Sequence, residues 1–366
     1  MKPTIVHLSG ADHGGAERQL LALLKTAVAG AGNGYRHEVV LVREGPLAAD
    51  FAGLVPTTVL AKGRPLDLRF LRELRSALQR AHPAIVHSWA PTPNLWGPIV
   101  AKSLTGRSRP KTVLAEVGLD EWKGRLLKLA DRLSYRCADL VVGCAQAVTR
   151  AAIRRGAPAA RTDTVYLGVQ LPPWPERAPI RGRVQLLGRV DFRKGHRLLL
   201  EIWPEVKAAF PAAELVLAGP AASAEELELR ADLLDQIGRN PVLAGSVRMI
   251  DRVDPAEYLA QAEVLVVPST SEGLPNVILE AFSYRVPVVA TDVGGIGELV
   301  RDGHSGWLVP AGDRDAFRDA LLAALADRRL AQDRADAGRA RVAEMDLAAS
   351  LAHWEEIYAR LLEPAR

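Results

Sequence analysis

Two glutamates eight residues apart are the strongest candidates for chemistry in this sequence. Glu272 follows the apolar run Val264–Val267, and Glu280 lies in the apolar segment that comes next. The run is typical of a buried strand and the segment of a helix, so Glu272 is expected in the loop at the carboxyl end of the strand. Ligands of open α/β sheets bind outside such strand ends. Because carboxylates accept hydrogen bonds from hydroxyl groups, the pair predicts contact with a sugar or a ribose.

Two cations lie in a glycine-rich turn that precedes the glutamates. The turn Gly188–Gly195 contains Arg189 and Lys194, and it separates a predicted strand from a helix expected to start near His196. N–H groups at a helix start attract anions, and a guanidinium and an ammonium beside them would bind a diphosphate. A solvated basic loop without a ligand is the alternative.

Another glycine-rich turn, with Gly14 and Gly15, follows the first predicted strand and opens a helix. Glycine lets a backbone approach a ligand closely, although a tight turn alone would also use this pair. The turn lacks the G-x-G-x-x-G spacing, so the sequence gives little support for a nicotinamide dinucleotide.

Two features argue against a metal site. Asp313 and Asp315 form D-x-D, but an apolar helix follows them, so Asp313 is expected to be a helix N-cap. Cys137 and Cys144 are the only cysteines; Cys144 is expected in the core, and a disulfide scaffold is excluded. We expect neither a metal nor another cofactor.

The elements that would position these residues form an α/β pattern in both halves of the 366-residue chain. Near-continuous apolar strands separated by helical patterns indicate parallel sheets covered on both faces. We therefore predict two doubly wound, Rossmann-like domains, 1–170 and 171–346, and a terminal segment 347–366 with a helix over Leu347–Leu362. The prolines of Leu171–Pro179 indicate the linker. The predicted strands are Thr4–Leu8, His37–Val42, Thr57–Leu60, Ala84–His87, Thr112–Ala115, Asp139–Val142, Thr164–Tyr166, Val184–Leu187, Glu214–Leu217, Val247–Ile250, Val264–Val267 and Val286–Ala290.

Charge differs between the halves more than the formal net charge of +4 suggests. Residues 1–170 hold 24 Lys+Arg and 13 Asp+Glu, whereas the remainder holds 23 and 30. A basic half joined to an acidic half indicates that the first half meets an anionic partner, although drifted surface composition would also give this pattern. Nine of these 24 basic side chains fall on the predicted helix Leu66–Ala81 and on the stretch 123–136.

Five motifs in one order resemble the group 1 glycosyltransferases, the large fourth family of retaining enzymes with the GT-B fold. Glu272 and Glu280 match the E-x7-E motif of this family. The other matching segments are Gly14–Arg18, Gly188–Arg189 with Lys194–Gly195, Pro287–Gly295 and Trp354–Tyr358. The resemblance implies two domains facing across a cleft, with the C-terminal helix crossing back to the first domain.

The resemblance also implies a role for each motif. Arg189 and Lys194 would bind the diphosphate of a nucleotide-sugar, Glu280 the ribose and Glu272 the transferred sugar. Other expected donor-binding residues are Gly14, Gly15, Arg252 in the base-binding loop, and Gly273, Leu274, Pro275, Asn276 and Val277 near the phosphates or the sugar.

One departure from the family pattern concerns the first half. Many members carry a histidine after the strand that corresponds to Thr112–Ala115, near the donor sugar. This chain has Glu116 there, as other branches of the family do, and His87 is the available imidazole. His87 is expected either in the cleft or as a buried, hydrogen-bonded histidine.

The predicted function is transfer of a sugar, with retention of configuration, from a UDP- or GDP-sugar to a glycan or lipid-linked acceptor. A catalytically silent homologue acting as a partner subunit and another GT-B activity, such as an epimerase or a phosphorylase, are the alternatives. The excess of Arg over Lys, 38 against 9, hints at a bacterial source and envelope polysaccharide or glycolipid assembly. No apolar run is long enough to span a membrane, so a cytoplasmic protein peripheral to the inner face of the plasma membrane is expected, with no nucleic-acid partner.

Overall fold

The computed structural model divides the chain into two compact units. Unit 1 comprises residues 1–168 and 345–366, and unit 2 comprises residues 169–344. The structure describes residues 2–363 except 13, 32–33, 61, 63–66, 105–108, 121–122, 174–176 and 252. The predicted linker Leu171–Pro179 and the predicted start of a helix at Leu66 therefore lie partly outside the described residues.

Unit 1 is built on a seven-stranded parallel sheet. Its strands lie in the order β3 (Thr57–Val59), β2 (Arg36–Leu41), β1 (Thr4–Ser9), β4 (Ile85–Trp89), β5 (Lys111–Glu116), β6 (Leu140–Gly143) and β7 (Thr162–Thr164). The central strands are buried on both faces, which explains their continuous apolar sequences. The chain reverses direction across the sheet between β1 and β4, so a ligand crevice is expected outside those strand ends.

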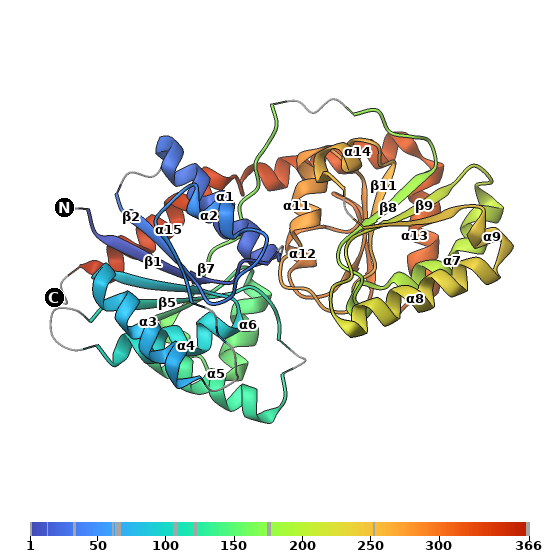
Figure 1. Cartoon of the computed structure of the whole chain (residues 1–366). Coiled ribbons are helices and arrows are strands. Elements are labelled where there is room, and N and C mark those ends of the chain that lie inside the picture. The colour runs from blue at the N-terminus through green and yellow to red at the C-terminus, as the bar shows by residue number, and fades with distance from the viewer. Residues whose placement is uncertain are drawn as a thin grey trace. The chain divides into compact units, whose positions relative to one another are not determined.

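Helices cover both faces of this sheet (Figure 1). One face packs against α1 (Gly15–Thr26), α2 (Ala48–Ala52) and α15 (Leu347–Leu362), and the apolar stripe of α15 includes Leu351 and Trp354. The other face packs against α3 (Leu68–Ala81), α4 (Pro91–Lys102), α5 (Arg125–Cys137) and α6 (Gln146–Arg155). A short π-helix at Ala27–Ala31 and a 3₁₀ helix at Ala159–Arg161 complete the described helices of the unit.

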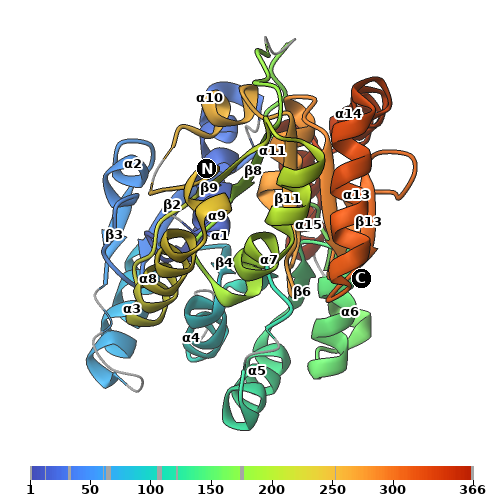
Figure 2. The ribbon, with the colours of Figure 1, turned by 90° about the vertical axis from the view of Figure 1, so that its right-hand side faces the viewer.

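Unit 2 repeats the same architecture with a six-stranded parallel sheet. Its order is β10 (Val247–Ile250), β9 (Glu214–Ala218), β8 (Arg183–Leu187), β11 (Val264–Val267), β12 (Val288–Asp292) and β13 (Trp307–Pro310). One face packs against α7 (His196–Ala209), α8 (Ala224–Arg239), α9 (Pro241–Ala244) and α13 (Arg314–Ala326), which Figure 2 shows from their outer side. The remaining helices are α10 (Pro255–Ala260), α11 (Asn276–Ser283), α12 (Ile296–Leu299) and α14 (Arg328–Ala343).

The predicted fold class, two doubly wound α/β domains, is confirmed. Among the described strands, only β13 has no counterpart in the predictions; it is an edge strand that ends at Pro310, and a proline-ended run of four residues is a weak strand signal. Asp313 caps α13 by accepting a hydrogen bond from the N–H of Ala316, as expected from its position before an apolar helix.

Candidate active site

Several of the predicted donor-binding residues lie at the point where the strand order of unit 2 reverses. The chain proceeds from β8 through β9 to β10 and then returns to place β11 on the other side of β8. The loop after β8 carries Arg189 and Lys194, and the loop after β11 carries Glu272. Both loops leave the carboxyl ends of adjacent parallel strands, where doubly wound sheets bind their ligands. The sequence prediction for the position of Glu272 is confirmed.

The side chains of Lys194 and Glu272 meet although they are 78 residues apart. Lys194 Nζ lies 2.6 Å from Glu272 Oε1, and Ser269 Oγ donates a hydrogen bond to the same oxygen at 2.7 Å. The side chain of Lys194 is 29% exposed and that of Glu272 is 10% exposed. The ammonium is thus held at the strand ends but remains open to solvent. Ser269, which the sequence analysis did not select, fixes the carboxylate.

Glycines hold the surrounding loops in close contact. Gly195 has a φ of +73°, and a Cβ on it would lie 2.1 Å from the carbonyl oxygen of Pro268. Gly294, with a φ of +58°, leaves only 1.8 Å between such a Cβ and the carbonyl oxygen of Glu272. L-residues with a side chain are strained at these angles and would also push the loops apart. The loops after β8 and β12 therefore both press against the loop that carries Glu272.

Arg189 is the more exposed of the two cations. Its Nη1 lies 3.1 Å from Glu226 Oε1, and its side chain is 55% exposed. Glu226 is itself fixed, since it belongs to the capping box that Ser223 forms at the start of α8. Sequence reasoning did not find Glu226, because the partner lies 37 residues away on another element.

Helix α11 begins at this site, and the residues predicted near the phosphates form its N-terminus. Pro275 is the N-cap, Asn276 is the first helical residue, and Leu274 is buried just before them. Glu280 lies on α11 and is half-buried. The first N–H groups of a helix carry a partial positive charge, so this end of α11 suits an anion. Arg252, predicted in the base-binding loop, lies outside the described residues.

In unit 1, the turn with Gly14 and Gly15 follows β1 at the equivalent strand end. Gly14 is the N-cap of α1, and α1 starts at Gly15. The carboxylate of Glu17 occupies the space beside the turn: a Cβ on Gly14 would lie 2.2 Å from Glu17 Oε2. The absence of a side chain at Gly14 therefore leaves room for the buried carboxylate of Glu17 at the start of α1.

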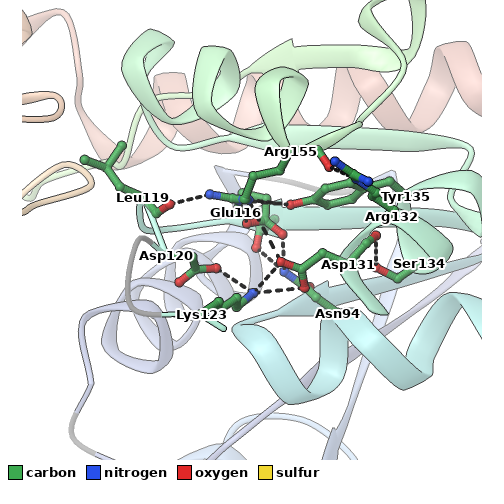
Figure 3. A network of polar contacts seen from close by, with 11 residues as sticks. Asn94, Glu116, Leu119, Asp120, Lys123, Asp131, Arg132, Ser134, Tyr135 and Arg155 are labelled. Carbon is green, nitrogen blue, oxygen red and sulfur yellow. Dashed lines mark hydrogen bonds and ion pairs between the residues drawn. The ribbon is translucent and has the colours of Figure 1, made fainter. Parts of the chain in front are cut away.

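Glu116 ends β5 and lies within a buried set of charged side chains (Figure 3). Arg155 Nη2 donates to Glu116 Oε2 at 2.7 Å, and Asn94 Nδ2 donates to Glu116 Oε1 at 3.2 Å. Lys123 lies next to this pair and contacts Asp120 and Asp131. We refer to Asn94, Glu116, Asp120, Lys123, Asp131, Tyr135 and Arg155 as the Glu116 network.

Burial governs protonation within the Glu116 network. Burial raises the pKa of Glu116 to about 7, and the charge of Arg155 opposes part of this rise. Burial alone would lower the pKa of Lys123. The charges of Asp120 and Glu116, together with hydrogen bonds to Asp120 and Asp131, more than offset this effect, and the pKa is raised. Arg155 also bonds the hydroxyl of Tyr135 at 2.9 Å and the carbonyl of Leu119. The carboxylate of Glu116, which stands where many family members have a histidine, is therefore held by side chains of unit 1 itself.

The prediction that His87 lies in a cleft as a candidate catalytic residue is corrected by its position in the structure. Its side chain is fully buried, its Nδ1 lies 2.7 Å from the hydroxyl of Tyr358, and its ring lies 4.5 Å from those of Trp89 and Trp354. Burial lowers the pKa of His87 to about 3. The alternative considered from the sequence, a buried and hydrogen-bonded histidine, describes it, because the middle of β4 faces α15 rather than the end of the sheet.

Within the part of the chain that the structure describes, no group of three or more His, Cys, Asp or Glu side chains is arranged to hold a metal ion. No helix among the described residues is both long and apolar enough to cross a membrane.

Family models match both halves of the chain. Residues 13–171 match the model of Glycosyltransferase Family 4, and residues 181–327 match that of Glycosyl transferases group 1. The resemblance drawn from the motifs is thereby confirmed. The chain belongs to the group 1 glycosyltransferases.

Curated relatives are similar over part of their length. A glycogen synthase of Mycobacterium tuberculosis is 30% identical over 190 residues, which cover 50% of this chain and 44% of the relative. A phosphatidyl-myo-inositol mannosyltransferase of Mycobacterium leprae is 35% identical over 168 residues, 44% of this chain and 42% of that protein. A D-inositol 3-phosphate glycosyltransferase of Catenulispora acidiphila is 28% identical over 293 residues, 74% and 67% of the two chains. The chain spans less than half the length of the first two.

Solved structures match the fold over nearly the whole chain. Anabaena Alr3699/HepE in complex with UDP-glucose is 22% identical with a TM-score of 0.85, covering 98% of this chain and 99% of the other. The sucrose-phosphate synthase of Thermosynechococcus elongatus is 20% identical with a TM-score of 0.80, covering 98% and 99%. The two parallel-sheet units therefore have the GT-B fold.

Proposed function

We propose that this chain transfers a sugar, with retention of anomeric configuration, from a nucleoside diphosphate donor to a glycan or lipid-linked acceptor. The observation that carries the proposal is the group formed by Lys194, Glu272 and Ser269 at the ends of β8 and β11. A UDP- or GDP-sugar is the expected donor, and a neighbour of known structure was crystallised with UDP-glucose. Lys194 and Arg189 would bind the diphosphate, and Glu280 would bind the ribose.

Binding of the donor would require the cations to exchange partners. Lys194 is paired with Glu272, and Arg189 with Glu226, in pairs that solvent reaches. A diphosphate offers more negative charge than a single carboxylate, so both cations would turn toward it. Glu272 would then be free to accept hydrogen bonds from the hydroxyls of the transferred sugar.

The chemical step requires no protein nucleophile. The bond between the anomeric carbon and the diphosphate oxygen breaks, and the acceptor oxygen bonds to the same face of the sugar. The acceptor proton passes to the departing phosphate oxygen. Negative charge grows on that oxygen as the bond breaks, so Lys194 and Arg189 stabilise the transition state. The reaction needs positioning and charge from this chain and no metal.

Glu116 acts in this proposal as a positioning residue rather than as a substitute for histidine. Its carboxylate is buried and shared with Arg155 and Asn94. Lys123 and Asp120, which form an ion pair at 2.7 Å, belong to the same network after β5. These buried charges at the carboxyl end of β5 would shape the acceptor side of unit 1.

A cytoplasmic protein that associates peripherally with an anionic membrane surface through unit 1 fits this function. Residues 1–170 carry the positive excess of the chain. A mannosyltransferase of phosphatidyl-myo-inositol is among the relatives of partial length. A lipid-linked acceptor would be presented at such a surface.

A donor panel tests the proposal most directly. Thermal unfolding is measured with UDP-glucose, UDP-N-acetylglucosamine, GDP-mannose and the free nucleoside diphosphates. A donor at 100 times its Kd adds about 2.7 kcal/mol to the free energy of unfolding and raises Tm. A chain that none of these ligands stabilises would contradict the donor role.

Two further readouts separate the enzyme from its alternatives. Proton NMR of fresh product from an α-linked donor should show an α-linkage; a β-linkage would exclude the retaining mechanism. Donor binding with neither transfer nor donor hydrolysis would identify a catalytically silent homologue. Isomerisation of the donor sugar without transfer would identify an epimerase.

A further inference from the structure

Helix α5 of unit 1 exposes a stripe of leucines to solvent. The exposed fraction is 84% for Leu126, 62% for Leu129 and 54% for Leu133, and the neighbouring Leu127 is 44% exposed. At 3.6 residues per turn, Leu126, Leu129 and Leu133 lie on one face of the helix. Four of the large exposed apolar side chains of the described residues thus belong to one helix of 13 residues.

The opposite face of α5 is the one that packs on its own domain. Asp131, Ser134 and Tyr135 are buried, and Asp131 and Tyr135 belong to the Glu116 network. The ribbon views show α5 at the edge of unit 1, beside α4 and α6 (Figures 1 and 2). The leucine stripe therefore lies on the face of α5 that does not pack against the rest of unit 1.

Cations flank the leucine stripe on one side. Arg125, Lys128, Arg132 and Arg136 are exposed, and the single carboxylate of α5, that of Asp131, is turned inward. Among the described residues, none of these four cations forms an ion pair. The exposed surface of α5 therefore combines apolar side chains with uncompensated positive charge.

Two other helices show that this combination is not general in this chain. On α3, Arg69 pairs with Glu73 at 2.7 Å and Arg75 donates a hydrogen bond to the carbonyl of Ser103. Two arginines of α3 therefore already have partners within the chain. On α8 of unit 2, Leu227 and Leu234 are exposed with the same seven-residue spacing as Leu126 and Leu133. Exposed acidic residues, among them Glu225, Glu228 and Asp235, surround them. Exposed leucines alone therefore do not distinguish α5 from α8. What distinguishes α5 from both helices is that its exposed leucines lie beside cations that form no ion pair among the described residues.

We propose that the exposed face of α5 docks unit 1 on an anionic lipid bilayer, with Leu126, Leu129 and Leu133 inserted at the level of the headgroups. The proposal rests on the proposed lipid-linked acceptor and names the element that would bring unit 1 to it. An interfacial helix has this arrangement, an apolar face in the acyl boundary and cations at the phosphates. Charge complementarity favours the bilayer over a second copy, since two basic α5 faces would repel each other.

Sedimentation with vesicles tests the proposal on the full chain. The vesicles contain phosphatidylcholine alone or phosphatidylcholine with phosphatidylglycerol. Three variants are compared with wild type: L126Q/L129Q/L133Q, R125Q/K128Q/R136Q, and the control L227Q/L234Q on the acidic helix α8. All substituted side chains are exposed, and Arg132 is kept because it bonds the carbonyl of Arg155. Donor binding by thermal shift is measured for each variant without vesicles.

Wild type should sediment with the anionic vesicles only. The leucine variant should lose roughly a hundredfold or more in partition coefficient. The cation variant should lose about a hundredfold, at about fivefold per charge, and its residual binding should depend less on salt. The α8 control should bind as wild type does.

Two outcomes would overturn the proposal: equal sedimentation of wild type and the leucine variant, or equal binding to neutral and anionic vesicles. A concentration-dependent dimer that the leucine variant abolishes, with no vesicle binding, would assign the face to a second copy instead. Loss of vesicle binding with intact donor binding would separate docking from the donor site. Failure of the donor to bind wild type and every variant would contradict the proposed function. The vesicle result would then still decide whether α5 docks on anionic lipid.

Discussion

The two units share one architecture but hold their charged groups differently. In unit 2, Lys194 and Arg189 pair with carboxylates while their side chains remain 29% and 55% exposed. In unit 1, Glu116, Arg155 and Lys123 are 3%, 9% and 4% exposed. Solvent-exposed pairs are worth little and can exchange partners, whereas separating a buried pair leaves a charge without solvation. The exposed cations of unit 2 can therefore change partners, whereas the buried charges of unit 1 hold β5 to α6.

The largest difference between the units should appear on acidification. Unit 1 buries His7, His37 and His87 together beneath α15, and burial lowers the pKa of each, to about 4 for His37 and about 3 for His87. Among the described residues of unit 2, one comparable group is His196, whose pKa burial lowers to about 4. Unit 1 also contains Glu116, whose pKa burial raises to about 7.

The sign follows from which state binds protons more tightly. An imidazole with a lowered folded pKa stabilises the fold above pH 6.5, and this stability is lost as pH falls toward the folded value. From pH 7 to 5, His37 and His87 in unit 1 and His196 in unit 2 each lower the free energy of unfolding by about 2 kcal/mol. Glu116, whose folded pKa is raised, increases the stability of unit 1 by about 2 kcal/mol over the same range. Because His7 acts in the same direction as the other buried histidines, we expect unit 1 to lose more stability than unit 2.

Hydrogen exchange at pH 7 and pH 5, corrected for the intrinsic exchange rates, measures this difference. Amides of β1, β4 and α15 should lose more protection than those of β8, β11 and α11. The opposite order would show that the histidine cluster does not set the acid sensitivity.

The next largest effect is expected from opening the Glu116 network. Arg155→Met leaves the carboxylate of Glu116 buried without its cation, which should cost about 3–5 kcal/mol of unfolding free energy in urea titrations. Replacing both partners, as Glu116→Leu with Arg155→Met, should recover much of the loss, because no charge then remains unpaired. Arg189→Met in unit 2 is the control and should change stability by no more than about 0.5 kcal/mol. Equal losses for Arg155 and Arg189 would remove the contrast between the units.

Sequence reasoning was most successful where local pattern decides structure. The strands β8 and β11, the start of α7 at His196 and the bounds of α15 follow from apolar periodicity and turn residues. The pairing of Glu116 with Arg155 could not be predicted, since it joins β5 to α6 across 39 residues and depends on how those elements pack. For the same reason, the sequence selected Lys194 and Glu272 separately but did not predict their contact, which joins residues 78 positions apart. Ser269 is only three residues from Glu272, but the direction of its hydroxyl depends on the conformation of the loop, which the sequence pattern does not specify.

Substitution of the cations in unit 2 should affect catalysis rather than stability. Lys194→Ala and Arg189→Ala should each lower kcat by about 10²–10³ at saturating donor, or roughly 2.7–4 kcal/mol, because they act on charge that grows in the transition state. Circular dichroism and Tm should stay close to wild type. Arg197→Ala is the matched control, since Arg197 is an exposed arginine of α7 that pairs with Asp232. Wild-type kcat in both Lys194→Ala and Arg189→Ala would refute the leaving-group role.

The smallest expected effect is that of Glu280→Gln, which compares Glu280 with the cations Lys194 and Arg189 of the same unit. Glu280 lies half-buried on α11, one element away from the cations, and is proposed to accept hydrogen bonds from ribose hydroxyls. Those hydroxyls change little in charge during the reaction, so their contacts contribute equally to the ground state and the transition state. The amide of Gln keeps one acceptor oxygen but loses the charge, which should raise the donor KM by about tenfold and change kcat less. Initial rates across donor concentrations, with the Kd of the free nucleoside diphosphate measured by calorimetry, separate the two parameters. A fall in kcat with unchanged KM would instead place Glu280 among the groups that act on the breaking bond.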